Sequence, residues 1–83
     1  MTLLEKLLSE AEEERKKGHP FLVLFYEDGY SFDTTDSEGL PLRHLEDGEP
    51  DWDYPQIWVK RDTFFAALND GLSELKKELK NGD

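Results

Sequence analysis

The side chains that could carry chemistry in this chain are mostly carboxylates, and they gather in its middle. Ser31 and Ser37 have His44 as a conceivable base, but nothing else supports a catalytic triad, and turn and strand roles explain all three. A pair of carboxylates doing acid–base work needs a cleft that shifts their pKa values, which is hard to build in 83 residues. We therefore expect no enzymatic activity.

Two acidic turns could hold a hard cation through oxygen ligands. One contains Asp33, Asp36 and Glu38, and the other contains Asp47, Glu49, Asp51 and Asp53. An EF-hand loop beginning at Asp47 would need glycine and glutamate where Trp52 and Trp58 stand. The chain also has no glycine-rich phosphate loop and no cysteine. We expect neither a dedicated metal site nor a cofactor.

The stretch HLEDGEPDWDYPQIW, residues 44–58, places both tryptophans among five carboxylates and two prolines. Proline restricts the backbone, so this loop loses less entropy when it docks. Tryptophan and tyrosine are enriched in binding hot spots, and a carboxylate rim selects a basic partner. We expect Trp52 to contact a partner, whereas Trp58 either does the same or fills a gap beside the second helix. The candidate partner-binding residues are Trp52, Tyr54, Trp58, Asp47, Glu49, Asp51, Asp53, Tyr26 and Tyr30.

The net charge of −10 is concentrated in the same region. Residues 21–59 hold ten acids and the single base Arg43, together with eight of the ten aromatic residues. Such a field repels nucleic acid and anionic membranes and attracts cationic surfaces. It favours a protein partner with a basic or mixed surface. Simple solubility of a monomer is the alternative explanation.

The length predicts one domain, residues 1–83, with a limited stability margin. No apolar run approaches the ~20 residues of a membrane span, and charges interrupt the first apolar stretch, unlike a signal peptide. Without cysteine, no disulfide supplements the core. The cellular location is otherwise undetermined.

The ends of the chain have the periodicity of amphipathic helices. Thr2 and Glu5 fit a capping box ahead of a leucine stripe, and Gly18 is a left-handed stop, which predicts a helix over residues 2–17. A second helix follows Asp62 as its cap. Its predicted stripe is Phe64, Phe65, Leu68, Leu72, Leu75 and Leu79.

The middle predicts strands. FLVLFYE, residues 21–27, ends at Asp28-Gly29, a type I′ hairpin signal that pairs Phe25 with Phe32 and puts both on a core face. Residues 40–46 and 56–60 are candidates for two further strands, the latter with Ile57 and Val59 on one face. The fold predicted is α+β, in the order α-β-β-β(-β)-α. The simplest arrangement has both helices on one face of an antiparallel sheet of three to four strands. The alternative has one helix on each face.

The helical segments LLEKLLSEAEEERKKG and LSELKKELKNG use leucine, glutamate and lysine almost exclusively. In this style they resemble the idealised helices of computationally designed mini-proteins, over about a third of the chain. For such a protein, the irregular acidic middle implies a surface specified for function.

The best interpretation is a non-enzymatic protein-binding mini-domain presenting an acidic, aromatic central surface, residues 21–59. The alternatives are a natural acidic inhibitor that mimics nucleic acid and a designed protein made only to fold. A mimic needs its acids in a long stripe, whereas a binder needs exposed aromatic side chains at its centre.

Overall fold

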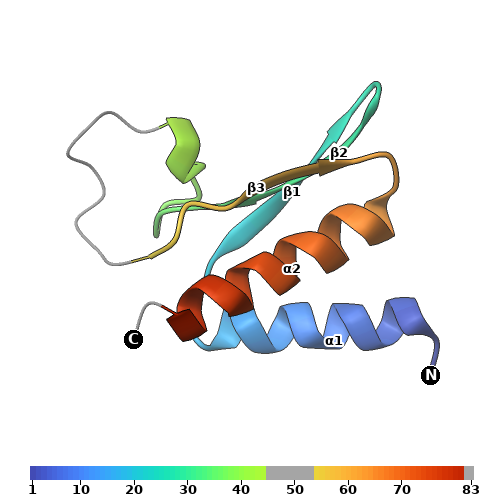
Figure 1. Cartoon of the computed structure of the whole chain (residues 1–83), viewed down its shortest axis with the longest axis horizontal. Coiled ribbons are helices and arrows are strands. Elements are labelled where there is room, and N and C mark those ends of the chain that lie inside the picture. The colour runs from blue at the N-terminus through green and yellow to red at the C-terminus, as the bar shows by residue number, and fades with distance from the viewer. Residues whose placement is uncertain (45–53, 82–83) are drawn as a thin grey trace.

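The computed structural model describes residues 1–44 and 54–81. The elements in chain order are helix α1 (Leu3–Lys16), strands β1 (Phe21–Tyr26) and β2 (Gly29–Thr34), the 3₁₀ turn η1 (Leu42–His44), strand β3 (Trp58–Arg61) and helix α2 (Phe64–Asn81). The strands form one antiparallel sheet in the order β1-β2-β3. Both helices lie on the same side of this sheet (Figure 1). The predicted α+β class and element order are confirmed.

Helix α1 begins at the capping box read from the sequence. The Glu5 amide donates to the Thr2 hydroxyl (3.1 Å), and the Thr2 amide donates to the Glu5 carboxylate (3.0 Å). These bonds to Thr2 lower the pKa of Glu5. Past the helix end, Gly18 takes the left-handed conformation with φ of 87°, as the sequence predicted.

The β1–β2 hairpin turns one residue earlier than predicted. Tyr26 pairs with Gly29, so residues 27 and 28 form the turn, and Phe25 lies opposite Tyr30. The predicted partners were therefore wrong by two positions. Because that shift is even, each strand keeps its predicted faces.

Gly29 occupies its position because of a contact distant in sequence. Its φ is 150°, and a Cβ added there would lie 2.6 Å from the carbonyl oxygen of Arg61 on β3. Asp28 has no positive φ, so the turn is not of type I′. The glycine serves the close approach of two strands rather than the turn itself.

The prediction of a strand over residues 40–46 is wrong for its described part. Pro41 makes only an isolated bridge to Thr35, and Leu42–His44 form the turn η1. The Asp36 carboxylate accepts from the amides of Glu38 and Leu40 (both 2.9 Å) and bends the chain just before this point. Residues 45 and 46 lie outside the described ranges.

Strand β3 and helix α2 follow the predicted pattern with a different cap. Ile57 and Val59 are buried toward the helices, whereas Trp58 points to the opposite side. The Ala66 amide donates to the hydroxyl of Thr63 (3.1 Å), so Thr63, and not the predicted Asp62, caps α2.

The core lies between the sheet and the helices. Its buried members are Leu7, Ala11, Phe32, Ile57, Val59, Leu68, Leu72 and Leu75. Gly71 of α2 lies directly over Phe32, because a Cβ added there would come within 2.1 Å of the Phe32 ring. The glycine, unfavourable in a helix by about 1 kcal/mol, lets α2 approach the sheet closely.

Two predicted core residues lie largely outside this core. Phe25 is 72% exposed and Phe65 is 40% exposed. Phe25 stands near the hairpin end of the sheet, where its ring lies beside those of Tyr30 (5.1 Å) and Phe64 (5.9 Å). The alternation of side chains along β1 correctly predicted the face on which Phe25 lies. It could not predict how far the helices extend along that face.

Candidate partner-binding surface

The side of the sheet away from the helices, here called the outer face, is partly open. Its side chains are those of Leu22, Leu24, Tyr26, Ser31, Asp33, Trp58 and Lys60, which alternate with the core-facing residues of the three strands. Trp58 is 50% exposed and Tyr26 is 40% exposed. The outer face therefore presents two of the predicted contact aromatics.

A buried ion pair connects η1 to the outer face. The carboxylate of Asp33 is almost fully buried and accepts from the guanidinium of Arg43 and from the hydroxyl of Ser31 (3.0 Å). Arg43 also donates to the Tyr26 hydroxyl (3.1 Å). The bond to Asp33 raises the pKa of Arg43 above its ordinary value. These contacts fix Arg43 across the middle of the sheet.

Two cations lie over the exposed rings. The guanidinium carbon of Arg43 is 4.9 Å from the centre of the Trp58 ring, and the Lys60 ammonium is 5.1 Å from that of Tyr26. Lys60 also binds the Asp28 carboxylate (2.9 and 3.0 Å), which lowers the pKa of Asp28. Cation–π contacts of this kind hold both rings in fixed orientations.

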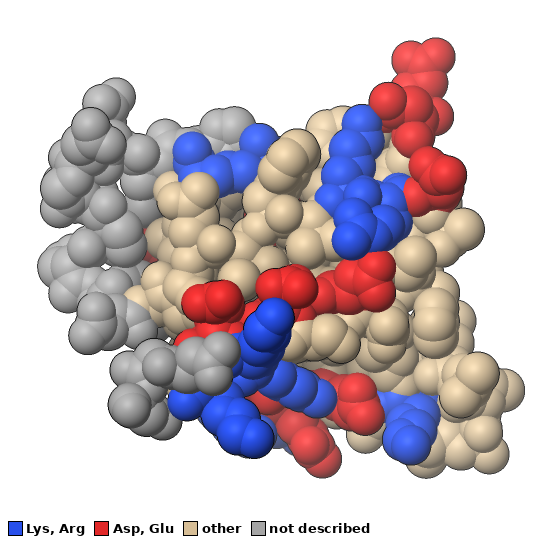
Figure 2. Space-filling view, viewed as in Figure 1, with Lys and Arg blue, Asp and Glu red and all other residues tan. Residues whose placement is uncertain are grey.

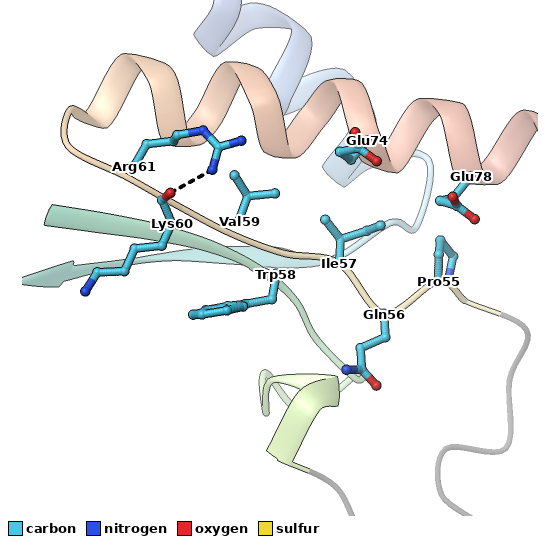
Figure 3. A pocket seen from close by; sticks show the side chains of 9 residues that line it. All are labelled: Pro55, Gln56, Ile57, Trp58, Val59, Lys60, Arg61, Glu74 and Glu78. Carbon is cyan, nitrogen blue, oxygen red and sulfur yellow. Dashed lines mark hydrogen bonds between the residues drawn. The ribbon is translucent and has the colours of Figure 1, made fainter.

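A groove of about 690 Å³ runs along the free edge of β3, here called the β3 groove. It lies between that strand and α2 (Figure 3). Its lining consists of Pro55, Gln56, Ile57, Trp58, Val59, Lys60, Arg61, Glu74 and Glu78. The groove thus combines one sheet edge with one helix face.

The backbone of β3 is open toward the groove. The Thr34 amide donates to the carbonyl of Ile57 (3.1 Å), so the odd-numbered residues of this segment face β2. Because backbone groups alternate along an antiparallel strand, the even-numbered Trp58 and Lys60 direct their N–H and C=O groups outward. Arg61 covers one of these groups, since its guanidinium donates to the Lys60 carbonyl (2.7 Å). Within residues 1–44 and 54–81, both Trp58 groups and the Lys60 N–H have no hydrogen-bond partner.

Carboxylates of α2 border this open edge. Asp70, Glu74 and Glu78 follow one another at four-residue spacing and so share a helix face. Figure 2 shows acidic side chains in a row across the middle of the molecule, with basic side chains on both sides of the row. Asp70 binds Arg61 (2.8 Å), whereas Glu74 and Glu78 pair with no cation among the described residues.

Two other predicted contact residues have structural roles. The Tyr54 hydroxyl donates to the Pro20 carbonyl (2.8 Å), its ring stacks on His19, and the side chain packs against the core. Burial, followed by the charge of Glu14, raises the pKa of Tyr54. Tyr30 is half-buried on the helix side of the sheet, where it meets the Phe64 ring.

The remaining candidates, Asp47, Glu49, Asp51, Trp52 and Asp53, lie outside the described residues. Sequence reasoning missed Arg43, Glu74 and Glu78. The four-residue spacing of the α2 acids was a usable signal for them. Among the described residues no cluster of carboxylates or histidines is arranged to hold a metal ion.

No known protein family, curated protein or solved structure matches this chain. Among the described residues, neither helix has both the length and the hydrophobicity needed to cross a membrane.

Proposed function

We propose that this chain is a non-enzymatic protein-binding module whose partner docks along the β3 groove as an extended segment. The supporting observation is the outer edge of β3, where both backbone groups of Trp58 and the N–H of Lys60 lie beside the carboxylates of Glu74 and Glu78, none of them paired with another described residue. An extended peptide can add to such an edge through main-chain hydrogen bonds, while its side chains occupy flanking sites.

The two flanks of the groove define the partner's chemistry. On the helix side, Glu74 and Glu78 favour lysine or arginine. On the outer face, the half-exposed ring of Trp58 favours an apolar side chain. Because side chains alternate along a strand, the matching partner is an extended segment that alternates basic and apolar residues. This choice agrees with the basic partner predicted from the net charge.

The described surface offers less support for a nucleic-acid mimic. A mimic needs an uninterrupted stripe of acids, but Arg61 neutralises Asp70 and basic side chains flank the acidic row (Figure 2). This arrangement favours a basic peptide partner over mimicry of nucleic acid.

The proposal predicts selective binding of a basic strand-forming probe. A fluorescently labelled synthetic peptide that alternates lysine and valine should bind, whereas one that alternates glutamate and valine should not. The double substitution Glu74→Lys/Glu78→Lys should weaken binding of the lysine peptide by about tenfold or more, because it reverses the charge beside the open edge. Fluorescence anisotropy at physiological salt measures both effects.

The matched control is Glu27→Lys/Glu38→Lys, which changes net charge by the same amount at exposed positions outside the groove. This variant should bind the lysine peptide nearly as well as the unmodified chain. Equal losses in both double variants would mean that diffuse charge attracts the peptide, and the β3 groove would not be the site.

A further inference from the structure

The other outer strand of the sheet, β1, has an unusually apolar free edge. FLVLFY contains no charged residue, no glycine and no proline, and no other described segment pairs with its far side. Natural sheets usually protect such edges with charges, prolines or bulges, because an open apolar edge templates pairing with another chain.

The hydrogen-bond ladder between β1 and β2 indicates which β1 residues direct their backbone groups away from the sheet. The backbone groups of Thr34 point toward β3, so those of its neighbour Thr35 must point toward β1. The Thr35 amide indeed donates to the Pro20 carbonyl (3.3 Å). By the same alternation the β1 residues that face β2 are the even-numbered ones. Phe21, Val23 and Phe25 therefore direct their N–H and C=O groups away from the sheet.

We propose that β1 pairs with β1 of a second copy of this chain, antiparallel and about a two-fold axis at Val23. An isologous contact of this kind pairs like with like across the axis. Val23 then lies opposite its own copy, and Phe21 lies opposite Phe25 of the second copy. On the outer face, Leu22 lies opposite Leu24. Each apolar side chain thus meets an apolar side chain, and two three-stranded sheets become one of six strands.

A groove beside β1 supports this register. It has a volume of about 340 Å³ and is lined by Leu8, Ala11, Glu12, Arg15 and Phe21. Cross-strand neighbours lie about 5 Å apart, so the two-fold places Phe25 of one copy next to Phe21 at the groove of the other. Phe25, now 72% exposed, would lose much of its contact with water. Leu8, 44% exposed, borders the same groove.

Charge modulates this association and does not determine it. Each copy carries a net charge of −10, which repels the other copy, but β1 itself carries no charge. Salt screens the repulsion, so dimerisation should become tighter as ionic strength rises. Binding of a basic segment at the β3 groove should instead become weaker with salt, which separates the two proposals experimentally.

Sedimentation velocity over a range from micromolar to millimolar protein tests the proposed dimer. The unmodified chain should convert from monomer to dimer with rising concentration. Val23→Pro removes an outward N–H and no bond of the β1–β2 ladder, and it should keep the chain monomeric. Phe25→Lys should do the same through charge repulsion, at a position exposed enough to tolerate lysine, and it keeps the test valid if the proline variant is poorly folded.

Lys60→Pro is the matched control, because it removes an outward N–H from the opposite edge of the sheet. It should dimerise like the unmodified chain. The proposal is overturned if the unmodified chain stays monomeric at millimolar concentration, or if folded Phe25→Lys dimerises as well as the unmodified chain.

Discussion

Phe32→Ala is expected to lower the free energy of unfolding by about 3–5 kcal/mol. Phe32 has no exposed surface, its ring stacks on Phe21 at 4.8 Å, and α2 covers it at Gly71. The deletion leaves a cavity between two rigid elements, which cannot collapse without moving the helix. A small domain has a total stability of roughly 5–15 kcal/mol, so this variant should be close to unfolding.

Phe25→Ala is the matched control for Phe32→Ala, since it removes the same side chain from the neighbouring strand. Phe25 is 72% exposed, so we expect a loss of about 1 kcal/mol, mainly from its aromatic contacts. Urea denaturation of both variants measures the difference. Similar losses would mean that Phe25 is as deeply packed as Phe32, and the described core would be incorrect.

Arg43→Met is expected to cost about 3–5 kcal/mol, because it leaves the buried Asp33 carboxylate without its cation. Ser31 would still donate one hydrogen bond, which does not offset a buried charge. Arg15→Met is the control, since the pair of Arg15 with Glu12 is exposed and screened by solvent, so its loss should destabilise the chain far less.

A second substitution tests the cause of the loss at Arg43. In the Arg43→Met background, Asp33→Asn removes the buried charge and should recover a large part of the lost stability, as a double-mutant cycle would show. If Arg43→Met is no more destabilising than Arg15→Met, the ion pair does not organise the outer face.

Local patterns predicted the helices well because their signals are local. The capping box at Thr2, the left-handed Gly18 and the leucine stripes depend on residues within a few positions of one another. The face of the sheet on which each strand residue lies was also predictable. Side chains alternate with a period of two residues, so a register shift of two positions leaves each residue on the same face. Ile57, Val59 and Trp58 lie on the faces their alternation indicated.

The wrong predictions concern residues whose conformation depends on contacts with partners distant in sequence. The position of Gly29 depends on the Arg61 carbonyl of another strand, and Leu42–His44 curl so that Arg43 reaches Asp33. Neither partner is identifiable from local sequence. The β3 groove could not be predicted for the same reason, because Trp58 and Glu74 line one groove only after the sheet packs on α2.

The most direct test of the open β3 edge is amide hydrogen exchange of the dilute protein, measured by NMR. We expect alternation along β3: the amides of Val59 and Arg61 should exchange at least about tenfold more slowly than those of Trp58 and Lys60. If Trp58 and Lys60 are protected as strongly as Val59 and Arg61, the edge is already paired. It then has no backbone groups free to receive a partner.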